Sequence, residues 1–353
     1  MENKRSIGMD VIKGLGIIAI VIGHTQSPLL RFVYSYHVVL FFFISGYFYK
    51  EEYRSNPIEL IKKRIKTLYV PFITYEFIFL ILHNVFVKFN IYHYQNYGIK
   101  DFVSSAFKIL TFHEIQSDAL GQFWFIKVLF ITNIVFWAIN FVLNKLKVVK
   151  KEVVGAVFMI LLFAADVVVT RHVGSGKGSF TVPTWSLVPV SLLAFFLGNM
   201  YKKYKAYIKL NLYLAILSLS GIILSCQFVG TNMGNFYMYP IVFVTNSVLG
   251  IYLNLYLAEV LVNKKRCGAL AFIGKNSLSI LALHMISFKL VNFMQINIYK
   301  MDYSYLNNRT ITNHIDWWIV YALFGVVMPI GVAMIVDRIK NIGNTIRFVS
   351  QKA

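Results

Sequence analysis

Long and almost uninterrupted apolar runs recur along the whole chain, and they limit its possible folds more than any other feature. Each run has roughly 18 to 25 residues, and about 20 helical residues are enough to cross the hydrocarbon core of a bilayer. The runs lie at residues 7–24, 32–48, 68–87, 123–143, 153–170, 182–200, 210–229, 236–262, 270–293 and 317–336. They lack the alternation of a membrane β-barrel strand. The sequence therefore predicts an all-α integral membrane protein, a single bundle of about ten transmembrane helices.

The composition agrees with this prediction. Only 14% of the residues are charged, whereas 58% are hydrophobic. A soluble domain has about a quarter of its residues charged. The low share of charge is therefore typical of a chain whose surface faces lipid.

The basic residues are distributed unevenly between the two sides of this bundle. The net charge is +20, and 23 Lys and Arg residues lie in the N-terminus, in the even-numbered connections between spans and in the C-terminal tail. The odd-numbered connections hold only Arg31, Lys88, Lys100, Lys108, Arg171, Lys177, Lys300 and Arg309. The positive-inside rule then predicts that both termini are cytoplasmic. The excess charge indicates topology and attraction to anionic lipid rather than nucleic-acid binding.

The chain reads as one membrane domain, residues 1–340, followed by a short basic cytoplasmic tail, residues 341–353. The first apolar run lacks a small-residue cleavage site and contains charged residues, so we expect a retained helix rather than a signal peptide. Residues 102–112, within the long outer segment 88–122, form an amphipathic stretch that we expect on the membrane surface.

Three ionisable residues, Asp10, Lys13 and His24, lie within the first run. Such residues are costly inside a membrane, so each is a candidate functional residue. At 100° per residue, Lys13 and His24 lie only about 20° apart around the helix axis and about 16 Å apart along it. The alternative is that Asp10 and Lys13 form an ion pair that only fixes helix packing, with His24 at the outer boundary.

Polar and aromatic residues in other runs provide further candidates. The second run contains His37 and Ser45, the fourth begins near Trp124, and the ninth contains Ser277 and His284 on one helical face. Trp124 also fits an ordinary interfacial aromatic belt, and Ser277 also fits a structural hydrogen bond between helices. No set of metal ligands is expected.

Several short motifs, in order along the chain, resemble those of the acyltransferase 3 family. The first is a basic residue followed after ten residues by histidine, which Lys13 and His24 match. The others are His37 to Tyr47 (H-x-x-x-F-F-F-x-S-G-Y), Lys63 to Lys66 (R-x-x-R-like), Trp124 to Ile126 (W-F-L-like) and Gly274 to His284 (G-x-x-S-L-x-x-L-x-x-H). The branch that is most similar comprises the fucose 4-O-acetylase-like or polysaccharide O-acetyltransferases. The main departure is lysine for arginine at positions 13, 63 and 66.

The resemblance implies an enzyme of the bacterial cytoplasmic membrane that transfers an acyl group, most often acetyl, from cytoplasmic acyl-CoA. The implied acceptor is a hydroxyl of a cell-surface glycan or of its lipid-linked precursor. Acyl-CoA is then a co-substrate, and no tightly bound cofactor is expected. The expected partners are acyl-CoA, the sugar acceptor and membrane lipid, and a homodimer is left open.

Each candidate residue then has an expected role. His24 acts as general base or as a transient acyl carrier. Asp10 or Lys13 orients groups along the helix, and Lys13 or Ser45 stabilises the oxyanion. Phosphates of the donor are held by a cationic cluster of Lys63, Arg64 and Lys66. The substrate chamber is lined by His37, Ser45, Trp124, Ser277 and His284.

The donor phosphates and His24 are expected at opposite sides of the membrane. We therefore expect the pantetheine arm to pass Lys13 between the first, second, fourth and ninth spans, and the acceptor to enter beside residues 88–122. Large side chains at Gly14 or Gly16 should block this passage without loss of folding.

Two other classes of protein remain as alternatives. A secondary transporter could use the Asp10, Lys13 and His24 stripe for ion coupling, although the two halves show no repeat. The chain could also be a structural subunit of a glycan-synthesis complex, but then these three ionisable residues would have no evident function.

Overall fold

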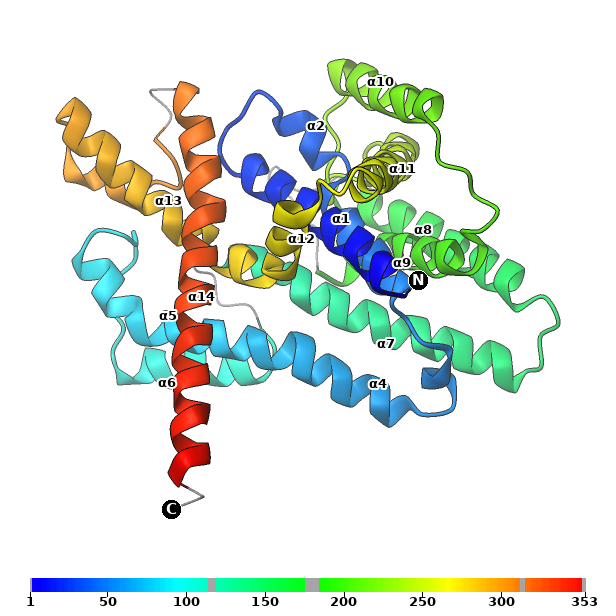
Figure 1. The fold of residues 1–353 in the computed structure, drawn as a ribbon, viewed down its shortest axis with the longest axis horizontal. Coiled ribbons are helices and arrows are strands. Elements are labelled where there is room, and N and C mark those ends of the chain that lie inside the picture. The colour runs from blue at the N-terminus through cyan, green and yellow to red at the C-terminus, as the bar shows by residue number, and fades with distance from the viewer. Residues whose placement is uncertain (1, 114–118, 175–183, 312–314, 351–353) are drawn as a thin grey trace.

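The structure, a computed structural model, is helical throughout its described part, residues 2–113, 119–174, 184–311 and 315–350; side chains are described for residues 7–113, 119–172, 184–311 and 316–339. The helices are α1 (Glu2–Gly23), α2 (Leu30–Tyr34), α3 (His37–Tyr47), α4 (Pro57–Arg64), α5 (Val70–Lys88), α6 (Ile99–Leu110), α7 (Trp124–Lys145), α8 (Lys151–Gly174), α9 (Leu187–Tyr204), α10 (Leu212–Phe228), α11 (Pro240–Asn263), α12 (Gly268–Lys275), α13 (Ser277–Tyr299) and α14 (Trp318–Ser350). None of the described residues forms a strand, so the all-α prediction is confirmed (Figure 1).

Eight helical segments in the described part are long and apolar enough to cross a membrane. They are Leu30–Tyr47, Pro57–Lys88, Gly121–Lys145, Lys151–His172, Thr184–Tyr204, Pro240–Asn263, Ser277–Tyr299 and Trp318–Ile339. These correspond to eight of the ten predicted spans. The seventh predicted span is the shorter apolar helix α10, and the first is α1. The total of ten and the cytoplasmic location of the termini stay predictions.

Some predicted features fall partly or wholly outside the described residues. These are residues 182 and 183 of the sixth predicted span, Lys177, residues 114–118 of the outer segment and residues 351–353 of the tail. Helix α14 continues without a break through residue 340, where the sequence suggested that the tail begins.

Two predicted spans are broken into two helices each. The second consists of α2 and α3, which are separated by Ser35 and Tyr36. The ninth was predicted as one helix over residues 270–293, but it ends at Lys275 and restarts at Ser277. At the break, the Asn276 side chain donates a hydrogen bond to the carbonyl oxygen of Phe272 at 2.9 Å. An asparagine that competes for backbone carbonyls in this way favours a helix end.

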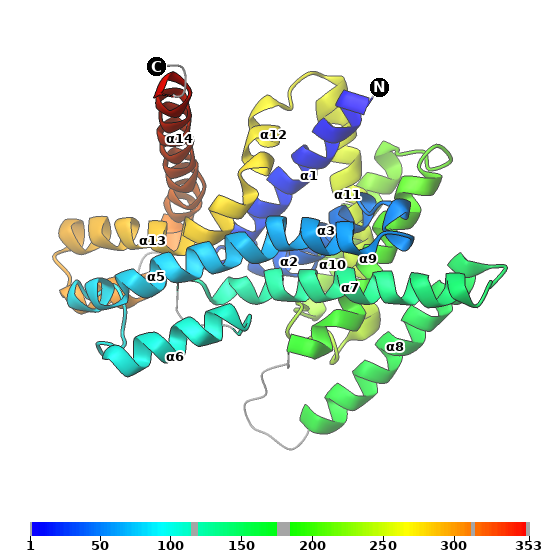
Figure 2. The same ribbon diagram turned by 90° about the horizontal axis from the view of Figure 1, so that it is seen from below.

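Glycines allow two pairs of helices to touch backbone to backbone. A Cβ atom on Gly14 of α1 would lie 2.2 Å from the carbonyl oxygen of Leu270 in α12, and one on Gly274 would lie 1.8 Å from that of Asp10. The crossing of α3 and α9 is equally close, because a Cβ on Gly46 would lie 1.8 Å from the carbonyl oxygen of Phe195. Such contacts between small residues are typical of packing between membrane helices. In both views α1 and α12 lie side by side (Figures 1 and 2).

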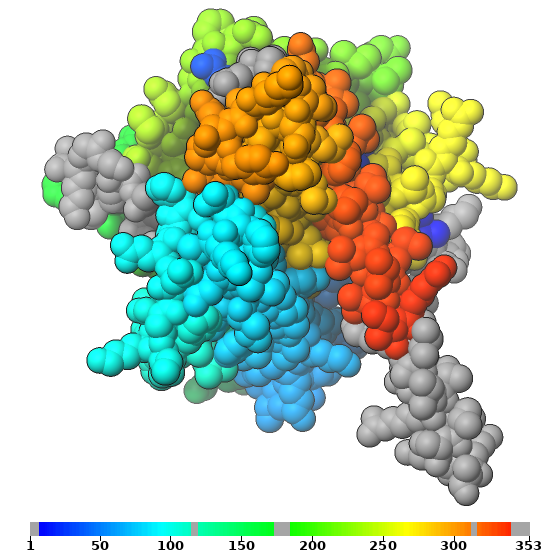
Figure 3. Space-filling view, turned by 90° about the vertical axis from the view of Figure 1, so that its left-hand side faces the viewer, coloured from blue at the N-terminus to red at the C-terminus, as the bar shows by residue number. Residues whose placement is uncertain are grey.

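The amphipathic stretch predicted on the membrane surface forms α6, which packs lengthwise and antiparallel against α5. At one end, Asn84 exchanges hydrogen bonds with the backbone of Tyr97 at 2.7 and 3.0 Å. At the other end, the Tyr69 hydroxyl donates to the carbonyl oxygen of Leu110 at 2.6 Å. Figure 3 shows this α5–α6 pair (cyan) beside α13 (orange), which in turn lies against α14 (red-orange). The hydrogen bonds at both ends hold α6 along the bundle helix α5.

Gly14→Ala should destabilise the protein, which corrects the expectation that a larger side chain at this position only blocks a passage. The new Cβ would overlap backbone, which cannot move aside as a flexible side chain can. We expect a loss of about 1–3 kcal/mol, seen as a lower thermal midpoint of the detergent-purified protein. Gly8→Ala in the same helix is the control, since nothing lies within 4 Å of its added Cβ. Equal midpoints for the two variants would contradict the crossing.

Candidate functional site

The residue His24 lies at the first turn after helix α1 ends. Its backbone N–H donates to the carbonyl oxygen of Val21 at 3.0 Å, and the Thr25 hydroxyl donates to that of Ile22 at 2.8 Å. These bonds close the helix end in a tight turn and place a half-buried imidazole next to α13 and α2. The stripe predicted from Asp10 to His24 therefore follows a continuous helix up to Gly23.

A second imidazole, that of His284, faces His24. The two ring centroids are 5.3 Å apart, and His284 is completely buried. Its Nδ1 lies 2.9 Å from the carbonyl oxygen of Ile280 and 3.0 Å from that of Leu281. Because a carbonyl oxygen only accepts, Nδ1 carries the hydrogen and Nε2 of the neutral ring is left as an acceptor. This Nε2 is buried and has no hydrogen-bond partner among the described residues.

The residues Tyr34 and His37 complete the cluster from α2 and α3. The Tyr34 ring packs edge-on against His24 at 6.2 Å and against His37 at 5.1 Å, and its hydroxyl oxygen lies 3.5 Å from His24 Nδ1. His37 is buried, and its Nδ1 donates to the carbonyl oxygen of Val33 at 2.6 Å. The structure thus brings together three of the predicted residues, His24, His37 and His284.

The residue Arg309 supplies a positive charge next to this histidine cluster. It lies in the connection between α13 and α14, is exposed, and acts electrostatically on His24, His284 and Tyr34. Sequence reasoning counted Arg309 only as a topology signal and did not select Tyr34. The available signal was weak: Tyr34 lies three residues before His37, and Arg309 is one of few basic residues on its predicted side.

The histidine cluster is suited to proton transfer. The described part of the chain contains no group of three His, Cys, Asp or Glu residues placed to hold a metal ion. A neutral imidazole with a free nitrogen can instead accept a proton from a hydroxyl group.

The residues Asp10 and Lys13 form an ion pair lower on α1. The Lys13 Nζ lies 3.0 Å from an Asp10 carboxylate oxygen and 5.4 Å from the centre of the Phe48 ring at the end of α3. Asp10 is buried and Lys13 is partly buried. The pairing agrees with the packing alternative, and it leaves the Lys13 ammonium over the Phe48 ring.

The remaining predicted chamber residues contact other parts of the bundle. Ser45 accepts a hydrogen bond from Asn133 of α7 at 3.4 Å. Trp124 begins α7 and is partly buried beside Phe125. Ser277 begins α13, two residues before Ser279, whose hydroxyl accepts a hydrogen bond from Tyr75 at 3.2 Å. These contacts place the three residues around α3, α7 and the start of α13.

The predicted cationic cluster is divided between surface and interior. Lys66 is exposed and Lys63 lies over the Tyr53 ring at 5.9 Å, but Arg64 is only 8% exposed. Successive helical residues point about 100° apart, and a π-helical turn (Ile65–Tyr69) follows Arg64, so the three side chains cannot share one face.

Several buried polar atoms around Arg64 lack partners. The guanidinium Nε and Nη2 of Arg64, and the hydroxyls of Tyr49 and Tyr53, have no hydrogen-bond partner among the described residues. Arg64 and both tyrosines interact electrostatically, and the two rings pack edge-on at 5.5 Å. A buried guanidinium without an acceptor is costly, so this group is suited to an anionic ligand.

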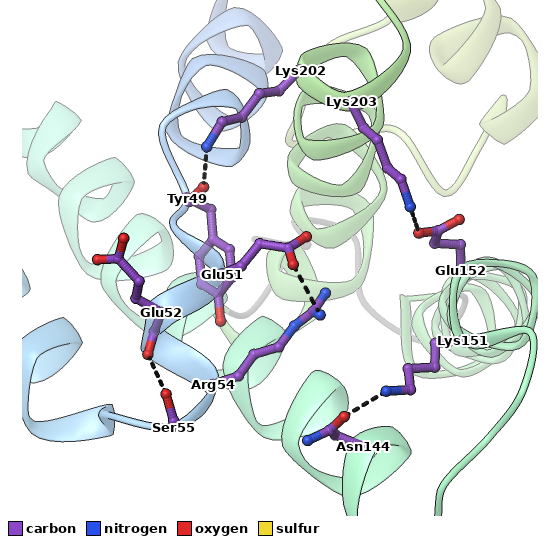
Figure 4. A network of polar contacts seen from close by, with 10 residues as sticks. All are labelled: Tyr49, Glu51, Glu52, Arg54, Ser55, Asn144, Lys151, Glu152, Lys202 and Lys203. Carbon is purple, nitrogen blue, oxygen red and sulfur yellow. Dashed lines mark hydrogen bonds and ion pairs between the residues drawn. The ribbon is translucent and has the colours of Figure 1, made fainter.

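Basic connections gather around this region (Figure 4). Arg54 pairs with Glu51 at 3.3 Å, Lys202 donates to the carbonyl oxygen of Tyr49 at 2.9 Å, and Lys203 pairs with Glu152. These residues come from three connections that the charge pattern assigned to one side. The structure places them together at one end of the bundle.

A cavity of about 440 Å³ lies elsewhere in the bundle. It is lined by residues of α1, α3, α9, α11 and the connection after α9, including Met9, Tyr201, Lys205 and Glu259. None of the predicted site residues lines it. This cavity is therefore separate from the histidine cluster.

Comparison with known proteins identifies the family. No curated protein and no solved structure matches this chain. The sequence model of the acyltransferase 3 family, described as an acyltransferase domain, matches residues 6–338, nearly the whole chain. The chain therefore belongs to the acyltransferase 3 family of membrane acyltransferases.

Proposed function

We propose that this membrane acyltransferase is an O-acyltransferase of the bacterial cytoplasmic membrane. It takes its acyl group, which we propose is acetyl, from cytoplasmic acyl-CoA. The acceptor is a hydroxyl of a cell-surface glycan or of its lipid-linked precursor. The observation that carries the proposal is the convergence of His24 and His284, whose rings are 5.3 Å apart, in a chain of this family. The resemblance of the motifs to the polysaccharide O-acetyltransferase branch supports the choice of acceptor.

In this reaction His24 is the general base. Its neutral imidazole accepts the proton of the acceptor hydroxyl while the hydroxyl oxygen attacks the thioester carbonyl carbon. The tetrahedral intermediate collapses, the bond between carbon and sulfur breaks, and the imidazolium returns the proton to the leaving thiolate. The products are the ester and free CoA. A base is needed because a sugar hydroxyl is a weak nucleophile at neutral pH.

The neighbouring groups assist by position. Tyr34 holds His24 from one edge, and the open Nε2 acceptor of His284 can receive a hydroxyl hydrogen of the bound sugar. Transient transfer of the acyl group to His24 is the alternative path, and it uses the same geometry.

The donor enters from the opposite end of the bundle. The buried guanidinium of Arg64 and the unpartnered hydroxyls of Tyr49 and Tyr53 provide donors for a phosphate oxygen, and Lys63 and Lys66 add positive charge nearby. From there the pantetheine arm follows α1 past Lys13 toward His24. Lys13, beside Phe48, then contacts the donor or the developing oxyanion.

His24→Ala should reduce ester formation by about 10²–10⁴-fold, the usual contribution of a general base. The measurement is mass spectrometry of envelope glycans from cells that express each variant, with the amount of membrane protein determined in parallel. His172→Ala is the control, because His172 is exposed near the end of α8 and lies outside the segment 88–122 beside which the acceptor is expected to enter. Normal ester content in the His24→Ala strain would remove His24 from the mechanism, and an ion flux that depends on His24 without ester formation would favour the transporter.

Arg64→Gln should raise the apparent KM for acyl-CoA by about 10-fold or more, since hydrogen bonds to charged groups contribute about 1.5–3 kcal/mol. The thermal midpoint without donor should stay equal or rise, because the substitution removes a buried charge that lacks a partner. Lys62→Gln is the matched control in the same helix, since Lys62 is exposed. A lower midpoint together with an unchanged KM would instead show that Arg64 serves the fold.

A further inference from the structure

The connection between α13 and α14 is held to the bundle by buried polar side chains of α13. Lys289 is only 6% exposed, and its ammonium donates to the carbonyl oxygens of Asn307 at 2.7 Å and Asn308 at 2.9 Å. Asn292, one helical turn further along α13, also donates to the carbonyl oxygen of Asn308, at 2.7 Å. The backbone immediately before Arg309 is therefore fixed by three hydrogen bonds.

The backbone after Arg309 is fixed as well. The N–H of Ile311 donates to the hydroxyl oxygen of Tyr321 in α14 at 2.9 Å. That hydroxyl donates in turn to Asn292 and accepts a hydrogen bond from Gln295 at 2.9 Å. Arg309 thus lies between two anchored points, although its own side chain is exposed.

The burial of these polar side chains costs more free energy than a purely structural role of the connection would justify. The ammonium of Lys289 is buried, and burial of a lysine in a membrane helix is unfavourable. An ordinary surface loop needs no such support. The unfavourable burial of Lys289 is explained if the protein requires Arg309 in a fixed position.

The anchored connection leads directly to the histidine cluster. Asn292, Phe288 and His284 follow one another at intervals of four residues and so share one face of α13. The Phe288 ring packs edge-on against His284 at 5.7 Å and against Tyr321 at 5.4 Å. The same face of α13 therefore binds the connection through Asn292 and carries His284, which faces His24. Asn292 and His284 are about two to three helical turns apart.

We propose that Arg309 binds an anionic group of the acceptor, a phosphate or a carboxylate, and so holds the acceptor hydroxyl beside His24. The proposal rests on the proposed function and adds the chemical class of the acceptor. A guanidinium offers a planar pair of N–H donors that matches either anion, and its charge persists at any physiological pH. Arg309 is exposed on the end of the bundle from which the acceptor is expected to enter.

Two kinds of acceptor carry the required anion. A lipid-linked sugar has a phosphate next to its first sugar, whereas an acidic glycan has carboxylates on the sugars themselves. Glucose 1-phosphate and glucuronate imitate these two groups, and glucose is the uncharged comparison.

The test measures transfer of labelled acetyl to envelope glycans in spheroplasts, whose outer surface is open to added sugars. Wild-type protein, Arg309→Gln, Arg309→Lys and the control Arg31→Gln are compared at equal amounts of membrane protein. Arg31 is a matched control because it is an exposed arginine on the same predicted side, and it contacts Cys226 of α10 rather than the histidines.

We expect Arg309→Gln to lower ester formation by about 10- to 100-fold, Arg309→Lys to recover part of it, and Arg31→Gln to have little effect. One of the two charged sugars should inhibit wild-type transfer at much lower concentration than glucose, and this difference should vanish in Arg309→Gln. Stronger inhibition by glucose 1-phosphate indicates a lipid-linked acceptor, and stronger inhibition by glucuronate indicates an acidic glycan.

Two results would overturn the proposal. One is a wild-type protein that is inhibited no better by either anion than by glucose. The other is an Arg309→Gln variant that makes as much ester as Arg31→Gln. In both cases the ester formed by the wild-type protein would leave the proposed function intact, whereas wild-type protein that forms no ester would contradict the function itself.

Discussion

The backbone contact between α1 and α12 is the constraint on which the histidine cluster depends. Gly14 and Gly274 leave no room for a Cβ atom at this crossing. Because α12 is joined to α13 through the single residue Asn276, fixing α12 against α1 also fixes where α13 begins. His284 lies two turns further along α13, and it therefore meets His24 at the end of α1. A contact between two glycines thus determines the distance between two imidazoles from opposite ends of the chain.

The second backbone crossing, of α3 with α9, supports the same cluster from another direction. Gly46 and Gly198 pack against the facing backbone, and they hold α3 so that His37 at its first turn reaches Tyr34 and the other histidines. Close contact between small residues is effective in a membrane because the hydrophobic effect supplies little force between helices there. Core packing and site geometry are consequently set by the same few positions.

Polar atoms without partners are the second organising feature, and they occur at two separate places. His284 Nε2 lies in the histidine cluster, whereas the Arg64 guanidinium and the Tyr49 and Tyr53 hydroxyls lie near the gathered basic connections. An unpartnered polar group in a low-dielectric interior is costly, so both places are suited to ligands that restore the missing hydrogen bonds. Between them, the Asp10–Lys13 pair keeps a charge inside the membrane at reduced cost because the two groups neutralise each other. The proposed reaction uses the two separate places, one for the cytoplasmic donor and the other for the acceptor beside His24.

The sequence by itself determined the all-α membrane class, the positions of most spans and the candidates His24, His37 and His284, because these depend on local hydrophobicity and on motif spacing. Three of the basic connections that the charge pattern assigned to one side lie close together. It did not reveal the breaks at Ser35–Tyr36 and Asn276, the position of α6 along α5 or the burial of Arg64, since each depends on which neighbour a segment packs against. Arg309 could not be selected from its surroundings in the chain. Only the tertiary structure decided its place, because its connection is held by hydrogen bonds from Lys289 and Asn292 of α13 and by one to the Tyr321 hydroxyl of α14.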